Sequence, residues 1–160
     1  MISPHPKILI DALANPTHKD RELITKAYHF AENAHKEQTR RDGKTPYFHH
    51  VLDVARIAGD RFGFDDELIA TALLHDTLED TSLSEKQMQD AGIHHSVIEA
   101  VQWLTLTKDR HYLDNISAIK NSKNQLAIRV KIADNLANLA DSPTDKQILK
   151  YAKSLQILLS

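Results

Sequence analysis

A stretch of apolar residues in the middle of the sequence ends in a dense group of polar side chains. Leu68–Leu74 is followed by His75, Asp76, Glu79 and Asp80. Buried carboxylates are costly unless a cation compensates their charge. In a helix, residues four apart share a face, so His75 pairs with Glu79 and Asp76 with Asp80. The segment therefore predicts a cation site, and the alternative is an ordinary solvated helix end.

A second candidate lies in an apolar stretch further along the chain. Asp134 and Asn138 are again four residues apart, so they share one face of the expected helix. An isolated aspartate in such a helix can instead pair with a basic neighbour, here Arg129 or Lys131. Taken alone, this segment favours the ion pair.

Two adjacent histidines, His49 and His50, open another expected helix. Neighbouring side chains on a helix point about 100° apart, so at most one of them faces a shared site and the other is exposed. Histidine is a common metal ligand, and the chain has 10 of them. It has no cysteine, which excludes a thiolate metal site and a cysteine nucleophile.

The composition fits one helical domain. A chain of 160 residues with a net charge of −2 gives no electrostatic reason to expect a nucleic acid or an anionic membrane as partner. No signal peptide and no membrane span are recognisable, so we expect a soluble, cytoplasmic protein. Only 4 glycines and 5 prolines interrupt the chain, which favours helix throughout.

Hydrophobic periodicity and capping residues predict an all-α fold. The stretch from Glu67 to about Glu79 is apolar nearly all round and should be the central helix. The expected helices are Ile2–Ala14, 20–38, Phe48–Phe62, Glu67–Glu79, Ser84–Asp90, Ser96–Leu106, Leu113–Lys120, Gln125–Leu139 and Thr144–Leu158.

Four ordered motifs resemble the HD superfamily of metal-dependent phosphohydrolases, and in particular the hydrolase domain of RelA/SpoT homologues, including the stand-alone small alarmone hydrolases. Residues 35–40 are similar to H-x-x-Q-x-R, and 43–50 to G-x-P-Y-x-x-H with one extra residue before the proline. Residues 74–81 match L-H-D-x-x-E-D-T, and 131–138 resemble K-L-A-D-x-L-x-N. The resemblance covers roughly 27–142.

The resemblance implies an HD-domain helical bundle, with 1–160 as a single domain and a motif-bearing core at about 20–142. The metal it implies is Mn²⁺, although ligands of this kind do not exclude Fe²⁺, Co²⁺ or Zn²⁺. The cation lowers the pKa of the attacking water while a carboxylate takes the proton. The implied metal ligands are His50, His75, Asp76 and Asp134, and the implied catalytic residues are Glu79 and Asp80.

For the substrate, the resemblance implies a guanosine 3′,5′-bis-diphosphate alarmone, (p)ppGpp, cleaved to GDP or GTP and pyrophosphate. Arg40 matches an arginine that packs against the nucleobase, and Asn138 a residue on the nucleotide side of the pocket. Arg41, Lys44 and Lys108 could offset phosphate charge or be solvated surface cations. Substrate-binding candidates are Arg40, Arg41, Lys44, Tyr47 and Asn138, Tyr47 being either core or ligand wall.

Three positions depart from the family pattern. Asn135 and Ala140 stand where cations are common, and Val51 replaces a usual proline. The hydrolytic chemistry is therefore better supported than the substrate. Two alternatives stay open: an HD nucleotidase or pyrophosphohydrolase acting on another nucleotide, and a catalytically silent HD scaffold that binds nucleotide or protein. We expect hydrolase activity only, with no synthetase domain. His35 is either structural or part of the site.

Overall fold

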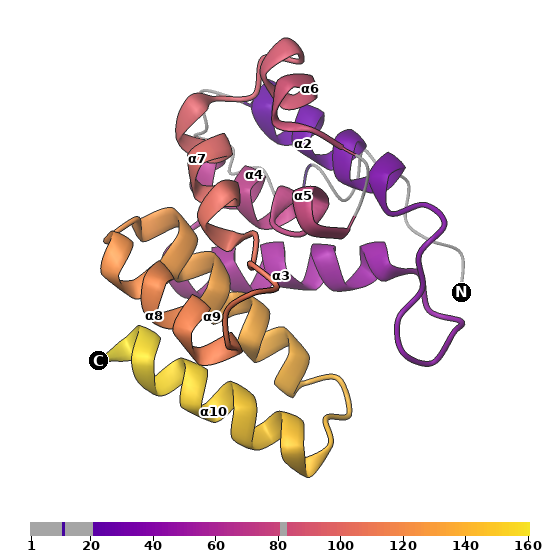
Figure 1. The fold of residues 1–160 in the computed structure, drawn as a ribbon. Helices are drawn as coiled ribbons and strands as arrows, with labels where there is room; N and C mark the ends of the chain where they lie inside the picture. Colours follow the sequence, from indigo (N-terminus) through magenta and orange to yellow (C-terminus); the bar gives the residue numbers. More distant parts are fainter. Residues whose placement is uncertain (1–10, 12–20, 81–82) are drawn as a thin grey trace.

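The computed structural model describes Asp11, residues 21–80 and residues 83–160, without the side chain of Asp80. The described residues form helices and contain no strand, which confirms the all-α prediction (Figure 1). The helix expected at Ile2–Ala14 falls outside them apart from Asp11. The elements are α2 (Arg21–Ala34), α3 (Tyr47–Phe62), α4 (Asp66–Leu74), α5 (Thr77–Asp80), α6 (Glu85–Asp90), α7 (His95–Leu104), α8 (Tyr112–Ser122), α9 (Gln125–Leu139) and α10 (Asp145–Leu159).

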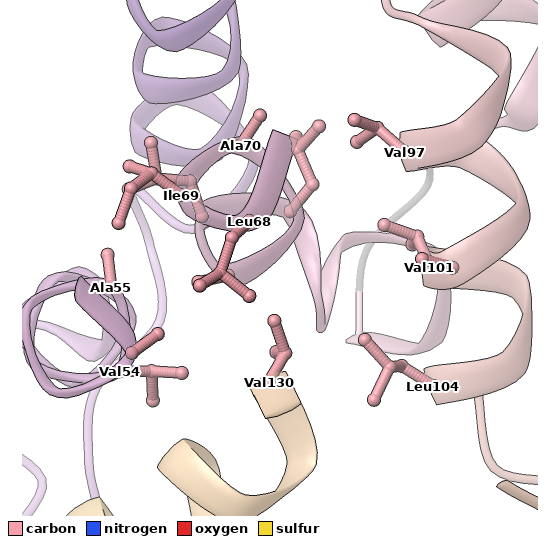
Figure 2. Close-up of a cluster of buried hydrophobic side chains, with 14 of the residues drawn as sticks. Val54, Ala55, Leu68, Ile69, Ala70, Val97, Val101, Leu104 and Val130 are labelled. Atoms are coloured by element: carbon pink, nitrogen blue, oxygen red, sulfur yellow. The ribbon is translucent and has the colours of Figure 1, made fainter. Parts of the chain in front are cut away.

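Helix α4 is the centre of the fold, as its composition predicts. It packs against α2, α3, α7 and α9, and all its residues from Leu68 to Leu74 are buried. Figure 2 shows labelled residues of α4 in the core among residues of α3, α7 and α9. The labelled residues are Val54, Ala55, Leu68, Ile69, Ala70, Val97, Val101, Leu104 and Val130.

The prediction of one continuous helix from Glu67 to Glu79 is wrong, because α4 ends at Leu74 and α5 begins at Thr77. Two side chains satisfy backbone carbonyls at the end of α4: the Nδ1 atom of His75 lies 2.7 Å from the Ala72 oxygen, and the Thr77 hydroxyl donates to the Leu74 oxygen at 2.7 Å. Such bonds replace the intrahelical partners that a helix end lacks. The argument that residues four apart share a helix face therefore does not apply to His75 with Glu79 or to Asp76 with Asp80, because each pair spans the turn between α4 and α5.

The loop before α3 is held by short-range hydrogen bonds. Helix α2 ends at Ala34 rather than near Gln38, and Thr39 and Pro46 then form an isolated β-bridge. Within the loop, the Asp42 carboxylate accepts hydrogen bonds from the backbone N–H groups of Lys44 and Thr45 and from the Thr45 hydroxyl. These bonds fix the segment that carries Arg40 and Arg41.

The C-terminal helices pack side by side, with α10 lying against α8 and α9 (Figure 1). Asn135 of α9 is fully buried and joins all three: its amide nitrogen donates to the Ser154 hydroxyl at 2.5 Å, and its oxygen accepts from the Tyr112 hydroxyl at 3.2 Å. Within the described part of the chain, no helix has the length and apolar character needed to span a membrane.

Candidate metal centre and surrounding pocket

Three separate parts of the fold bring four predicted metal ligands together. His50 comes from α3, His75 and Asp76 from the turn between α4 and α5, and Asp134 from α9. The ligand atoms of His50, His75 and Asp76 lie within 4.8 Å of one another. The Asp134 Oδ1 atom is 3.0 Å from the Nε2 of His50 and 3.7 Å from the Nε2 of His75.

The hydrogen bond of His75 to the backbone decides which ring nitrogen faces this cluster. Because only a protonated Nδ1 can donate to the Ala72 oxygen at 2.7 Å, the neutral ring has a lone pair on Nε2. That Nε2 atom is buried and lies 2.9 Å from the Asp76 Oδ2 atom. Facing two carboxylates, Nε2 shares a cation with them, which is a proton when no metal is bound, and the donor set fits a divalent metal ion in its place.

The two oxygens of Asp134 have different partners. Oδ2 accepts from the ammonium of Lys131 at 2.8 Å, while Oδ1 faces the histidines and accepts from the Asn138 side-chain amide at 2.9 Å. The ion pair of Asp134 that the sequence suggested as an alternative is therefore present, with Lys131 as the partner. It occupies one oxygen and leaves the other directed at the cluster.

Mutual attraction shifts the acidities of these groups. Burial opposes the charged form of each, but neighbouring charges outweigh it. The His75 pKa is held well above its ordinary value by Asp76 and Asp134. In turn, His75 and the Tyr47 hydroxyl lower the Asp76 pKa to about 2. Lys131, followed by His50 and His75, holds the Asp134 pKa well below its usual range. Both carboxylates therefore stay ionised, which is the form in which they can bind a cation.

Tyr47 takes part in the cluster rather than only lining it. Its hydroxyl donates to the Asp76 Oδ2 atom, and its ring packs between the rings of His35 and His50, with centroids 5.0 and 5.5 Å away. His35 is fully buried and its Nδ1 lies 2.7 Å from the Gln38 side-chain oxygen. His35 therefore supports Tyr47 from behind and does not reach the carboxylates directly.

A pocket of about 210 Å³ opens in front of the cluster. His50, Asp76 and Asp134 line it, together with the predicted residues Tyr47, Glu79 and Asn138. Glu79 is exposed, and its Oε2 atom accepts from the Leu106 backbone N–H at 3.4 Å. The side chain of Asp80 lies outside the described residues, so its predicted role stays a prediction.

Arg40 lies beside this pocket in a fixed position. Its guanidinium donates through Nε and Nη2 to the Asp141 Oδ2 atom at 3.1 and 2.7 Å, and Nη2 also donates to the Asn138 side-chain oxygen at 3.2 Å. Its Cζ atom lies 5.7 Å from the centre of the Tyr47 ring. A second pocket, of about 390 Å³, is lined by Arg40, Arg41 and other residues of this region.

The remaining candidates for the site are exposed on the surface. Arg41 is exposed and donates to the Asp141 backbone oxygen at 3.1 Å. Lys44 and Lys108 are exposed, and neither lines the pocket in front of His50, Asp76 and Asp134. His49 is exposed beside the buried His50, as their adjacency predicts.

Five residues that line this pocket were not predicted as site residues: Leu106, Tyr112, Lys131, Lys150 and Tyr151. Lys131 was named only as an ion-pair partner, although its position three residues before Asp134 places it on the same helix face. Tyr112, Lys150 and Tyr151 belong to α8 and α10, whose packing against α9 no local motif indicates.

The fold and the His–Asp cluster define a class of protein, and comparison with known families agrees. The family model described as HD domain matches residues 27–157. The chain therefore belongs to the HD domain family.

Relatives within that class are more specific. The guanosine-3′,5′-bis(diphosphate) 3′-pyrophosphohydrolase MESH1 of Xenopus tropicalis is 40% identical over 128 residues, covering 76% of this chain and 70% of the relative. MESH1 of Mus musculus is 35% identical over 123 residues, covering 74% and 68%. This chain is thus similar to MESH1 hydrolases over most of their length.

The chain is also similar to part of a longer protein and to a solved structure. The GTP pyrophosphokinase rsh of Brucella melitensis is 36% identical over 126 residues, covering 73% of this chain but only 16% of that longer protein. A solved structure, described as a metazoan ortholog of SpoT that hydrolyzes ppGpp, superposes with a TM-score of 0.76 and 24% identity, covering 91% of this chain and 88% of that one. At that identity the structural likeness establishes the fold.

Proposed function

We propose that this protein is a metal-dependent hydrolase that removes the 3′-pyrophosphate of (p)ppGpp, releasing GDP or GTP and pyrophosphate. The observation that carries the proposal is the convergence of two buried imidazoles and two carboxylates at the base of a pocket. The names of the MESH1 relatives supply the substrate class.

His50, His75, Asp76 and Asp134 would hold the ion. Two nitrogen and two oxygen donors without sulfur suit a borderline-to-hard divalent cation, and among such ions we propose Mn²⁺, the one that the family resemblance implies. When bound, such an ion lowers the pKa of water and withdraws charge from phosphoryl oxygens. Tyr47 orients Asp76 through its hydroxyl, and Lys131 holds one oxygen of Asp134 so that the other faces the histidines.

The proton of the attacking water goes to a carboxylate on α5. Glu79 lines the pocket next to Asp76 and is the acceptor that the structure describes, while Asp80 is its proposed partner in positioning the water. The water oxygen forms a bond to the 3′-linked phosphorus and the bond between that phosphorus and the 3′ oxygen breaks. The proton that the carboxylate took from the water then passes to the 3′ oxygen, directly or through solvent, which restores the carboxylate. Pyrophosphate and the 5′-phosphorylated guanosine are the products.

We assign the nucleoside to the side of the pocket where Arg40 lies. Asp141 and Asn138 hold its planar guanidinium beside the Tyr47 ring, and a guanidinium in a fixed plane is suited to stack on a base. Arg41 and Lys44 follow in the same loop and would add positive charge for phosphate. The proposal includes a small nucleotide as the partner rather than nucleic acid, a cytoplasmic location, and a single domain over 1–160.

The test is hydrolysis of ppGpp in the presence of Mn²⁺, with GDP and pyrophosphate separated by chromatography. We expect rapid release by the wild-type protein and its loss in Asp76→Ala, which removes one ligand. The matched control is Asp90→Ala, which removes an exposed carboxylate on α6. Thermal unfolding of each variant checks that it is folded.

Release that survives Asp76→Ala would refute the assigned metal site. No release by folded, Mn²⁺-supplied wild-type protein would refute the substrate while leaving the HD cluster in place. A panel of nucleoside mono-, di- and triphosphates then tests the nucleotidase alternative, which the uncharged Asn135 and Ala140 favour.

A further inference from the structure

Helix α10 presents three lysines to one groove. Lys146, Lys150 and Lys153 are spaced four and three residues apart, which places them along one face of the helix. All three line a groove of about 530 Å³ whose lining residues include no aspartate or glutamate. Among the described residues, none of the three ammonium groups forms an ion pair. The groove is therefore a cationic surface without an internal counter-charge.

This groove joins the pocket in front of the His–Asp cluster. Tyr112 and Lys150 line both, so one continuous surface runs from the carboxylates to α10. The Lys150 Nζ atom lies 4.1 Å from the centre of the Tyr112 ring and 5.4 Å from that of Tyr151. Two aromatic rings therefore fix the ammonium at the junction, which is unusual for a solvated surface lysine.

The charge of Lys150 is crowded by other cations. Burial first, and then the positive charges of Lys131 and Lys146, lower the Lys150 pKa, against the opposing effect of Asp134. An anion in the groove would relieve that repulsion. The geometry and the charge balance thus point to the same kind of occupant.

The position of Asn135 explains how α10 comes to supply these cations. Its side-chain amide is buried and forms hydrogen bonds with Ser154 on α10 and Tyr112 on α8. Ser154 lies one turn after Lys150. Asn135 therefore fixes the part of α10 that carries Lys150.

We propose that Lys150, assisted by Lys146 and Lys153, binds the second phosphate chain of the substrate, the 5′-diphosphate or 5′-triphosphate that is not cleaved. The inference rests on the proposed function, because a 3′-diphosphate at the cluster leaves the 5′ chain to extend out of the pocket. Seven residues of helix separate Lys146 from Lys153, about 10 Å at 1.5 Å per residue, so the lysines can follow two or three phosphates.

The test compares substrates that differ only at the 5′ position. Guanosine 3′-diphosphate with a 5′-hydroxyl, ppGpp and pppGpp are assayed with the wild-type protein, with Lys150→Gln, and with the triple variant Lys146→Gln/Lys150→Gln/Lys153→Gln. We expect kcat/KM to rise with 5′ phosphorylation in the wild-type protein. Lys150→Gln should reduce the ratio of kcat/KM for ppGpp over the 5′-hydroxyl substrate about three- to tenfold, as expected for a partly screened charge-assisted contact.

A binding measurement supplements the kinetics. Calorimetric titration with GDP and with guanosine measures the contribution of the 5′-diphosphate without turnover, and Lys150→Gln should remove most of the difference. Lys86→Gln is the control, because Lys86 is an exposed lysine on α6 that does not line the groove. Its ratios should match those of the wild-type protein.

The outcomes separate the two proposals. If all three substrates are hydrolysed and the ratio is the same in the wild-type and triple-variant proteins, the α10 site is refuted and the hydrolase stands. If no 3′-diphosphate is cleaved, the proposed function fails, and the GDP titration still decides whether α10 binds a phosphate chain.

Discussion

Replacing Lys131 by methionine should strongly destabilise the protein when no metal is present. The side chains of Lys131 and Asp134 are only 9% and 8% exposed, and their charged atoms lie 2.8 Å apart. At an effective dielectric constant of about 20, Coulomb attraction over that distance is about 6 kcal/mol. Desolvation of the two charges offsets part of it, so the expected loss on leaving Asp134 unpaired is about 3–5 kcal/mol.

The matched control is Lys86→Met. Lys86 and Asp90 form a pair of nearly the same length, 3.1 Å, but their side chains are 80% and 63% exposed. An exposed pair within one helix contributes about 0.3–0.5 kcal/mol, so burial is the main difference between the two substitutions. For a chain of this size, Lys131→Met should lower the Tm by roughly 6–20 °C and Lys86→Met by about 1–2 °C.

The assay is thermal unfolding in a chelator, repeated with Mn²⁺. A double-mutant cycle with Asp134→Asn isolates the cause, because the methionine should cost much less once the carboxylate is neutral. Since a bound ion supplies positive charge next to Asp134, Mn²⁺ should restore part of the lost stability. Equal Tm values for Lys131→Met and Lys86→Met in chelator would refute the interpretation of this pair as the support of Asp134.

Two further predictions concern α5 and the loop before α3. Glu79→Gln should leave Mn²⁺ affinity, measured by calorimetry, within about threefold of wild type while lowering kcat about 100-fold or more, the usual contribution of a general base; unchanged kcat would remove Glu79 from proton transfer. The Thr45 hydroxyl and the Lys44 and Thr45 backbone N–H groups lower the Asp42 pKa to about 2. Because this pKa is lower in the folded than in the unfolded protein, the ionised Asp42 stabilises the fold at pH values above the unfolded pKa near 3.9. That stabilisation is lost as the pH falls through about 2. The stability difference between the wild-type protein and Asp42→Asn should therefore be present at pH 6 and vanish near pH 2; a difference independent of pH would contradict it.

Much of the fold could be predicted because its signals are local. The apolar run of α4, the glycine at 63 and the polar loop before Tyr47 each mark an element in the sequence itself. The break at His75 and Asp76 was missed because nothing in the periodicity distinguishes a continuous helix from one whose last carbonyls bind side chains. The site nevertheless assembles, since α3 and α9 bring His50 and Asp134 to that turn.

The site residues that sequence reasoning missed share a physical reason. The sequence analysis named Lys131, but it treated an ion pair with Lys131 and a functional role of Asp134 as alternatives. In the structure one oxygen of Asp134 pairs with Lys131 and the other faces the histidines. Lys150 and Tyr151 reach the pocket only because α10 packs against α9. Contacts between helices distant in sequence leave no spacing pattern to find.

The positive charge at the edge of the pocket does not have to come from α9. The attraction of a phosphate chain depends on where positive charge lies relative to it, and the helix that carries the charge does not matter. A chain with uncharged residues at 135 and 140 can therefore keep a cationic pocket edge if another helix supplies the lysines and is fixed in place. The buried bond from Asn135 to Ser154 does so, and it implies that Ser154→Ala would weaken phosphate-chain binding without removing any charge. That substitution distinguishes positioning by α10 from a general attraction of three surface lysines.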